Sequence, residues 1–284
     1  MTFMTSEDLL GRFLQRHRRL AVLSGAGCST DSGIPDYRDG DGNWKHSQPV
    51  QYADFLRDAG TRRQYWARSF AGWQRISRAQ PNAAHTALAT LEEFGRLSLL
   101  ITQNVDNLHR VAGSRNVVDL HGVLHKVRCI DCGDITARAG LQHRLAELNP
   151  HWQAEVAKFA PDGDAVLEDT ATALFKVADC ESCGGLLKPD VVFFGESVPS
   201  DRVQLARQQL ADSDALLVIG SSLMVWSGFR FAKLAVESGK GLAIINRGKT
   251  RADDLADCKV NAGCAETLSR LLPYVLQESG TVDA

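Results

Sequence analysis

Five short apolar runs, each ending in small or polar residues, alternate along this chain with segments of helical periodicity. The runs span residues 20–23, 97–102, 117–120, 215–220 and 242–246, and the clearest helical segments span residues 61–78, 83–96, 201–212 and 229–238. Continuous apolar runs of this length are typical of strands that are buried on both faces of a parallel sheet. The alternation therefore predicts an α/β fold with a doubly wound, Rossmann-like parallel sheet, which binds ligands at the carboxyl ends of its strands.

Composition narrows the classes of partner. The 284 residues are 44% hydrophobic and 23% charged, as in soluble globular enzymes, and the formal net charge is -2. A chain so balanced has no overall positive field to attract nucleic acid or an anionic membrane, and no apolar run approaches the roughly 20 residues of a membrane span. We therefore expect no nucleic acid and no membrane partner. The sequence leaves the oligomeric state unknown.

The first 20 residues indicate an amphipathic helix rather than a targeting segment. A transit peptide avoids acidic residues, whereas Glu7 and Asp8 stand here, and no apolar stretch precedes a small-residue cleavage site. We therefore predict a cytoplasmic protein.

The seven cysteines include two C-x-x-C pairs, each followed by glycine: Cys129 with Cys132, and Cys180 with Cys183. Each pair can point two thiolates at one centre, and two pairs complete a tetrahedral zinc site with no open coordination position. A redox-active dithiol is the alternative, but that motif is usually single and opens a helix. The pattern predicts one structural zinc ion, although the spacer between the pairs is longer than the usual ~15–20 residues.

Two segments interrupt the alternation of strands and helices. The segment that carries the cysteine pairs predicts a small zinc-binding domain at residues 125–185, and a segment rich in tryptophan and arginine predicts a helical module at residues 46–81. The remaining residues, 1–45, 82–124 and 186–284, would form the Rossmann-like domain.

A glycine turn, Gly25-Ala26-Gly27, follows the first apolar run. Glycines in this position let backbone N–H groups approach a pyrophosphate, as in dinucleotide-binding loops. Thr30 replaces the third glycine of that motif, so an ordinary tight turn is nearly as consistent with the sequence. The polar stretch that continues to residue 42 is too long for an ordinary connection, and such loops usually fold over a ligand.

Amides and a carboxylate follow the second apolar run at Gln103, Asn104 and Asp106. One of these side chains could simply cap a helix. Because the cluster follows a predicted strand, where this class of fold binds ligands, we favour recognition of a polar ligand.

His121 ends the third predicted strand. A histidine can accept a proton near neutral pH, and general-base assistance contributes ~10²–10⁴ in rate. An isolated histidine is more often structural, but its position at a strand end makes His121 a candidate general base.

A β-rich run ends in glycine at residues 184–196. It indicates a core strand, and an exposed edge there could accept an extended peptide by strand addition.

Together these motifs form an ordered series that is more specific than any one of them. The series comprises G-A-G-x-S-T-x-S-G-I-P-D-Y-R from residue 25, Q-N-V-D-N-L-H from 103, H-G at 121, the paired C-x-x-C motifs, L-K-P-D-V-V-F-F-G-E from 187, G-S-S-L from 220 and I-N at 245. It resembles the sirtuin family over nearly all of residues 20–270, and within that family it is most similar to the class II members. The resemblance implies an NAD-dependent protein-lysine deacylase that consumes NAD as a co-substrate, cleaving it to nicotinamide and transferring the acyl group to ADP-ribose.

The resemblance also implies roles for particular residues. The catalytic residues would be His121, as the base, with Asn104 and Asp106 near the nicotinamide and its ribose. NAD would contact Gly25, Ala26, Gly27, Asp36, Tyr37, Arg38, Gln103, Asn104, Val105 and Asp106, and its adenosine half would contact Gly220, Ser221, Ser222, Asn246, Arg247, Gly248 and Cys264. The acylated lysine side chain of a protein substrate would lie against Val192, Phe193, Phe194, Gly195 and Glu196.

Two alternatives remain open. ADP-ribosyl transfer to protein would use the same activated ribose with a different nucleophile, and a non-catalytic NAD-responsive binding module would bind NAD without turnover.

Overall fold

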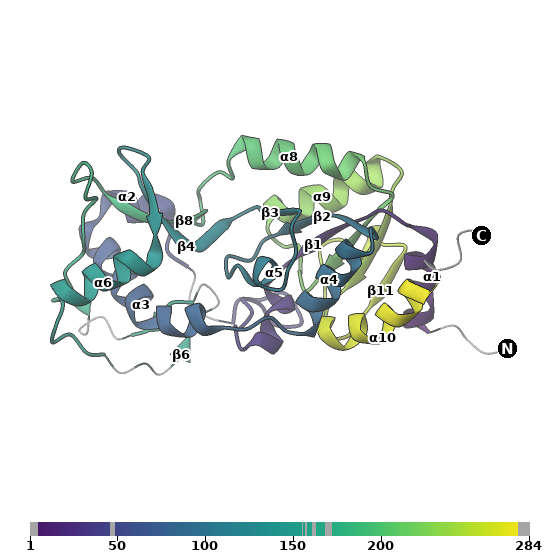
Figure 1. Ribbon diagram of the computed structural model, residues 1–284, viewed down its shortest axis with the longest axis horizontal. Coiled ribbons are helices and arrows are strands. Elements are labelled where there is room, and N and C mark those ends of the chain that lie inside the picture. Colours follow the sequence, from purple (N-terminus) through teal and green to yellow (C-terminus); the bar gives the residue numbers. More distant parts are fainter. Residues whose placement is uncertain are drawn as a thin grey trace.

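The computed structural model describes residues 5–45, 49–154, 156, 158–160, 163–167 and 172–277. Figure 1 shows a larger part built around one sheet, and a smaller lobe at the other end of the long axis. No helix in these ranges is long and apolar enough to cross a membrane.

The larger part contains a six-stranded parallel sheet in the order β11-β10-β9-β1-β2-β3. Its strands are β1 (Leu20–Ser24), β2 (Leu97–Thr102), β3 (Val117–Asp119), β9 (Ala215–Ile219), β10 (Gly241–Ile245) and β11 (Cys258–Val260). All five predicted runs are strands of this sheet, and the predicted Rossmann-like fold is confirmed. The edge strand β11 was not predicted.

Helices cover both faces of the sheet because alternate strand residues point to opposite sides. On one face, Val22 and Leu217 pack with side chains of α1 (Ser6–Arg16), α4 (Ala83–Glu93) and α10 (Cys264–Gln277). On the other face, Leu23 and Leu216 pack with α8 (Ser200–Ala211) and α9 (Trp226–Glu237). Figure 1 shows α8 and α9 above the sheet and α4 and α10 below it. The sheet is therefore doubly wound, as predicted.

The first helix begins where the sequence provides a capping box. The Thr5 hydroxyl accepts a hydrogen bond from the Asp8 amide, and the Asp8 carboxylate accepts one from the Thr5 amide. This exchange satisfies two N–H groups that a helix start leaves free. The predicted N-terminal helix is therefore present as α1.

The smaller lobe combines the two interrupting segments. It contains a three-stranded antiparallel sheet, β5-β4-β8, and the hairpin of β6 and β7. Its elements are α2 (Tyr52–Arg57), α3 (Ala59–Arg78), β4 (Gly122–Cys129), β5 (Ile135–Ala137), α6 (Arg138–Leu148), β6 (Lys158–Phe159), β7 (Ala165–Val166) and β8 (Leu187–Val191).

One hydrophobic core joins the helical module to the zinc-binding segment. Phe55 and Trp66 from the helices are buried together with Val127 and Leu187 from the small sheet. The indole Nε1 of Trp66 also donates a hydrogen bond to the Leu187 carbonyl at 3.2 Å. The two segments therefore pack as one lobe.

The division of the chain at residues 45/46, 81/82, 124/125 and 185/186 stays a prediction. Strand β4 begins at Gly122 and β8 ends at Val191, so these two of the three strands of the small sheet run past the predicted ends of the 125–185 segment. Residues 1–4, 46–48, 155, 157, 161–162, 168–171 and 278–284, which the predicted domains include, lie outside the described residues.

Candidate functional site

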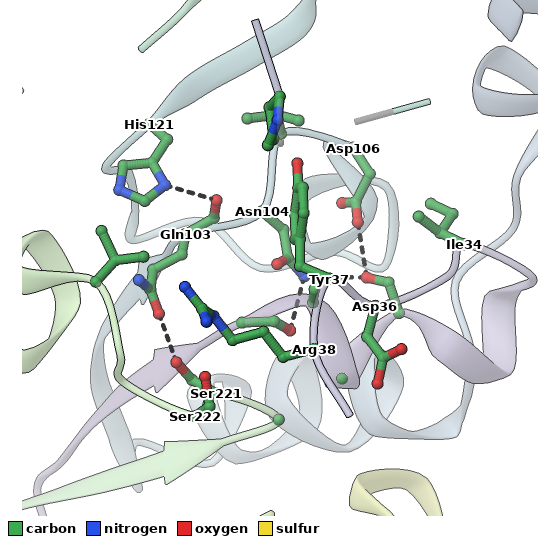
Figure 2. A pocket seen from close by; sticks show the side chains of 18 of the residues that line it. Ile34, Asp36, Tyr37, Arg38, Gln103, Asn104, Asp106, His121, Ser221 and Ser222 are labelled. Atoms are coloured by element: carbon green, nitrogen blue, oxygen red, sulfur yellow. Dashed lines mark hydrogen bonds between the residues drawn. The ribbon is translucent and has the colours of Figure 1, made fainter. Parts of the chain in front are cut away.

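One cavity lies where the carboxyl ends of the large sheet meet the smaller lobe, and Figure 2 shows it from close by. It brings together most of the predicted site residues. Those that line it are Gly25, Ala26, Gly27, Asp36, Tyr37, Arg38, Gln103, Asn104, Val105, Asp106, His121, Val192, Phe193, Phe194, Gly220, Ser221, Ser222, Asn246 and Arg247. Gly195, Glu196, Gly248 and Cys264 are not part of this lining.

The glycine turn after β1 lies directly against the end of β9. A Cβ added at Gly25 would lie 2.7 Å from the Ser221 Cβ, and one at Gly27 would lie 3.0 Å from the Gly220 Cα. The Gly27 amide donates a hydrogen bond to the Gly220 carbonyl at 2.8 Å. Glycine is needed here because any side chain would separate the two turns.

Asn104 and Asp106 fix the polar stretch that follows the turn. The Asn104 side-chain amide donates to the Ser29 hydroxyl at 3.0 Å and to the Gly25 carbonyl at 3.1 Å. The Ser29 hydroxyl donates in turn to Asp106 Oδ2 at 2.7 Å, while Asp106 Oδ1 accepts from the Leu108 amide that opens α5 (Leu108–Val111). Asp106 therefore holds a short helix with one oxygen and the glycine loop with the other.

Gln103 links the ends of β2 and β9. The Ser221 hydroxyl donates to the side-chain Oε1 of Gln103 at 2.7 Å, and the backbone N–H of Gln103 donates to the Ser24 carbonyl at 3.0 Å. In Figure 2, hydrogen bonds join His121, Gln103 and Ser221 in a row across the cavity. Gln103 thus holds together the ends of β1, β2 and β9 at the cavity wall.

The hydrogen bonds of His121 define its tautomer. Its Nδ1 lies 3.0 Å from the Gln103 carbonyl oxygen, which can only accept, so Nδ1 carries the proton. Its Nε2 therefore carries the lone pair, which accepts a hydrogen bond from the Ser227 hydroxyl at 2.8 Å. Burial lowers the pKa of His121 to about 4, against the opposing effect of the Gln103 hydrogen bond. The side chain is neutral at physiological pH and can accept a proton at Nε2.

Ser227 is a site residue that sequence reasoning missed. It lies in the first turn of α9, is 7% exposed and contacts His121 across 106 residues of chain. A hydroxyl near a helix start has many possible roles, and the spacing to His121 carries no local pattern. Only the fold brings the two side chains together.

Aromatic side chains connect the polar stretch after the glycine turn to the segment after β8. The Trp44 ring lies 5.5 Å from the Phe194 ring and 6.0 Å from the Tyr37 ring, and the Arg38 guanidinium lies 4.1 Å above Trp44. The Phe194 carbonyl accepts from the Tyr52 amide at 2.8 Å. One edge of Phe194 is therefore already paired, which limits where an added peptide strand could lie.

Glu196 turns the chain after β8. Its carboxylate accepts from the Phe193 amide at 2.8 Å and from Lys188 Nζ at 3.0 Å, and its own amide donates to the Phe193 carbonyl. These bonds close a tight turn at the cavity wall. Glu196 thus shapes the wall, while its carboxylate points to Lys188.

The two C-x-x-C pairs meet at one point in the smaller lobe. The sulfur atoms of Cys129 and Cys183 lie 3.5 Å apart, those of Cys132 and Cys180 lie 3.8 Å apart, and all four are within 4.8 Å of one another. A tetrahedral Zn²⁺ with bonds of about 2.3 Å needs sulfur atoms about 3.8 Å apart. The four cysteines are free of disulfide bonds. Their donor set fits one structural zinc ion, as predicted.

The glycine after each pair has a conformational reason. Gly133 and Gly184 have φ values of 78° and 72°, and their amides donate to the Cys129 and Cys180 carbonyls. This left-handed conformation favours glycine and turns each pair back on itself. The trailing glycine in each motif is therefore part of the metal-binding turn.

A model of the Sir2 family matches residues 25–227. The chain belongs to the Sir2 family. A relative named NAD-dependent protein deacetylase 2, from Bradyrhizobium diazoefficiens, is 55% identical over 260 residues, covering 92% of this chain and 95% of the relative.

Two further comparisons extend the Sir2 assignment. Human "NAD-dependent protein lipoamidase sirtuin-4, mitochondrial" is 49% identical over 267 residues, covering 93% of this chain and 85% of the relative. A solved structure described as "Sir2-p53 peptide-NAD+" has a TM-score of 0.76 and 31% identity, covering 98% of this chain and 100% of that one. The predicted family is therefore confirmed, and the Sir2 fold accounts for both lobes.

Proposed function

We propose that this chain is an NAD-dependent protein-lysine deacylase that cleaves NAD to nicotinamide and transfers the acyl group to ADP-ribose. The observation that carries the proposal is the lone pair on His121 Nε2, which belongs to the same cavity as the glycine turn, Asn104 and Asp106. The deacetylase name of the Bradyrhizobium relative supports it.

The cofactor assignment rests on the cavity lining. Gly25, Ala26 and Gly27 would contact the pyrophosphate through the backbone, and Asn104 and Asp106 would lie near the nicotinamide and its ribose. Ser221, Ser222, Asn246 and Arg247 would line the adenosine half. Gly248 and Cys264, which are outside the lining, would act behind it: the Gly248 carbonyl accepts from Asn246 Nδ2 at 3.4 Å, and the Cys264 thiol donates to the Ile245 carbonyl at 3.9 Å.

When bound, NAD supplies a ribose carbon that its positively charged nicotinamide makes reactive. His121 then accepts a proton at Nε2 from a ribose hydroxyl, because Nδ1 already carries a proton and donates it to Gln103. The Gln103 bond keeps the ring in place during this transfer. The hydrogen bonds of Ser29 to Asn104 and Asp106 hold the glycine loop over the cavity, which orients the reactants and limits access of water.

The acylated lysine would enter between the two lobes, against Val192, Phe193 and Phe194, with Gly195 and Glu196 completing the turn. The smaller lobe contributes apolar lining to the cavity through Tyr65, Ile76, Leu124 and Phe193. We infer that apolar acyl chains are accepted there. The class II assignment is part of this proposal, and the 49% identity to sirtuin-4, whose name includes lipoamidase activity, supports it.

The test is release of nicotinamide from NAD with one peptide carrying a panel of acyl-lysines, and the unacylated peptide as control. We expect release only with acylated peptide and formation of acyl-ADP-ribose. Label from NAD appearing on protein would instead favour ADP-ribosyl transfer. NAD binding with no release for any acyl group would favour a non-catalytic NAD-responsive module and reject the proposal.

We also propose that the protein acts in the cytoplasm on acylated proteins, without nucleic acid or membrane partners. Four of the seven cysteines fit a zinc site, and none of the seven forms a disulfide bond, which supports a reducing compartment. Fractionation of cells expressing the tagged chain tests this, and recovery with the membrane fraction would contradict it.

A further inference from the structure

Three buried side chains form a second group of metal-ligating atoms, beneath the glycine loop and apart from the four-cysteine cluster. They are Cys28, His85 and His109, which are 1%, 0% and 2% exposed. The Cys28 sulfur and one ring nitrogen of each histidine lie within 4.8 Å of one another. Cys28 ends η1 (Ala26–Cys28), His85 lies in the first turn of α4, and His109 lies in α5.

The hydrogen bonds of His109 leave one of its nitrogens without a partner. The Ser24 hydroxyl donates to Thr102 Oγ1 at 2.8 Å, so it accepts from His109 Nε2, also at 2.8 Å. The proton of neutral His109 is therefore on Nε2, and Nδ1 has a lone pair. Within the described part of the chain, this buried Nδ1 has no hydrogen-bond partner. An unpaired polar atom in the interior costs free energy, and a bound ion would remove that cost.

The ring nitrogen of His85 that could bind a metal ion, Nε2, makes only a long hydrogen-bond contact. Its Nδ1 accepts from the Asn82 amide at 3.2 Å, and its Nε2 lies 3.5 Å from the Ser29 hydroxyl, at the outer limit of a hydrogen bond. If Nε2 of His85 bound a metal ion, the ring proton would move to Nδ1. The hydrogen bond that Nδ1 now accepts from the Asn82 amide would then be lost, and the bond from Nε2 to the metal would be gained. The two rings lie 4.7 Å apart between centroids, so one ion can reach both.

We propose that Cys28, His85 and His109 form a second zinc site, at which a Zn²⁺ ion is bound reversibly. One thiolate and two imidazoles are a common ligand set for Zn²⁺, and three protein ligands leave one coordination position open. On binding, the Cys28 thiol releases its proton to solvent and its sulfur forms the bond to zinc. The remaining positive charge lies near the Asp106 carboxylate, which reaches Cys28's neighbour Ser29 at 2.7 Å.

The position of the site gives binding a consequence. Cys28 is joined by peptide bonds to Gly27 and Ser29, and both of these line the cavity. Drawing the sulfur toward two histidines shifts the loop and competes with the Ser29 bonds to Asn104 and Asp106. This consequence, unlike the binding itself, rests on the proposed function: zinc at this site inhibits by weakening the binding of NAD.

Binding is tested first, on full-length protein that already carries one structural zinc. Zn²⁺ is titrated in competition with a chromophoric chelator. We expect one further equivalent in the original protein, and loss of that equivalent in both Cys28→Ala and Cys28→Val, two variants of different size that guard against a packing defect. Cys258→Ala, which removes a buried cysteine of β11, is the matched control and keeps the additional equivalent.

A spectroscopic arm identifies the ligand. Co²⁺ added to the zinc-loaded protein should give a thiolate-to-cobalt absorption band that both Cys28 variants lack and that Cys258→Ala retains. If the unaltered protein binds only one zinc, or if either Cys28 variant keeps the second equivalent and the band, the proposed site is refuted.

The functional arm compares NAD-dependent acyl removal with and without the second equivalent, each variant being scaled to its own zinc-free rate. We expect at least a tenfold rise in KM for NAD in the original protein, and no rise in the Cys28 variants. Second-equivalent binding without inhibition would keep the site and overturn its effect on NAD. An absence of any deacylase activity would reject the proposed function and leave the binding result standing.

Discussion

Nε2 of His121 lies 2.8 Å from the hydroxyl oxygen of Ser227, which α9 brings to this ring from 106 residues further along the chain. The Gln103 carbonyl accepts a hydrogen bond from Nδ1, so the ring proton is on Nδ1 and Nε2 is unprotonated. The Ser227 hydroxyl must therefore donate to Nε2. This bond stabilises the neutral form of the ring. A ribose hydroxyl acting as the proton donor would have to take the place of Ser227.

Ser227→Ala should therefore raise the pKa of His121. A hydrogen bond of about 1 kcal/mol corresponds to a shift of about 0.7 pH units. The acidic limb of the kcat/KM profile for acyl removal should move upward by about that amount. Ser200→Ala, at an exposed position at the start of α8, is the control and should leave the profile unchanged. An unmoved profile for Ser227→Ala would show that the hydroxyl does not tune the base.

His121→Ala should abolish acyl removal and leave NAD binding largely intact. Loss of a general base lowers the rate by ~10²–10⁴. Nicotinamide release and calorimetric binding of NAD measure the two effects separately. His143→Ala, on the exposed side of α6, is the matched control. Loss of NAD binding with normal residual chemistry would reverse the assignment of His121.

Buried histidines should make the fold sensitive to acid. Burial lowers the pKa of His121 to about 4 and that of His109 well below its usual value, whereas both titrate near 6.5 in the unfolded chain. Between these values the unfolded chain binds more protons than the folded one, so the stability present above pH 6.5 is lost as pH falls toward 4.

Urea unfolding at pH 7 and pH 5 measures this effect. We expect the free energy of unfolding to fall by about 1–2 kcal/mol over that interval through His121 alone, whose pKa burial lowers to about 4. His121→Leu should reduce the pH dependence, and His143→Leu should not. An equal pH dependence in His121→Leu would mean that His121 does not contribute.

Cys132→Ser should release the structural zinc and unfold the smaller lobe. Structural zinc contributes an apparent ~10–16 kcal/mol in small peptides. Because Phe55 and Trp66 share one core with the small sheet, the helical module should lose order at the same time. Metal analysis and tryptophan fluorescence measure the two losses, with Cys258→Ser as the control. A folded, active protein without zinc would contradict the structural role.

Sequence alone predicted the parts whose cause is local. The strand at Leu20–Ser24 is apolar throughout because both faces are buried, and its pattern is visible without partners. The β11 strand, Cys258–Val260, has only three residues and includes Lys259, so the sequence contains no apolar run that would predict it. It exists because β10 offers an open edge.

The site shows the same division. The spacing of glycines and cysteines in a short motif determines the local turn that they form. The loop at Gly25 and the two metal-binding turns could therefore be predicted from the sequence. Pairings such as Ser221 with Gln103 depend on which strands become neighbours. The end of β8 at Val191 also depends on a side chain, because Glu196 captures the Phe193 amide and ends the strand.

The close approach of the turns after β1 and β9 gives the last prediction. In Gly25→Ala the new methyl group would lie 2.7 Å from the Ser221 Cβ and 2.8 Å from the Gly220 carbonyl oxygen, so the two turns must separate. NAD contacts both turns in the proposed complex. We therefore expect the Kd for NAD to rise at least about tenfold, or ~1.4 kcal/mol.

Gly140→Ala is the matched control, because a Cβ at Gly140 in α6 meets no atom within 4 Å. Gly140 is the third residue of α6, and in this first helical turn the change should leave NAD binding unaltered and raise stability by at most about 1 kcal/mol. Calorimetric titration with NAD and thermal unfolding test both variants. If Gly25→Ala binds NAD as tightly as Gly140→Ala does, the contact between the two turns is not what shapes the dinucleotide site, and the assignment of Gly25 must be withdrawn.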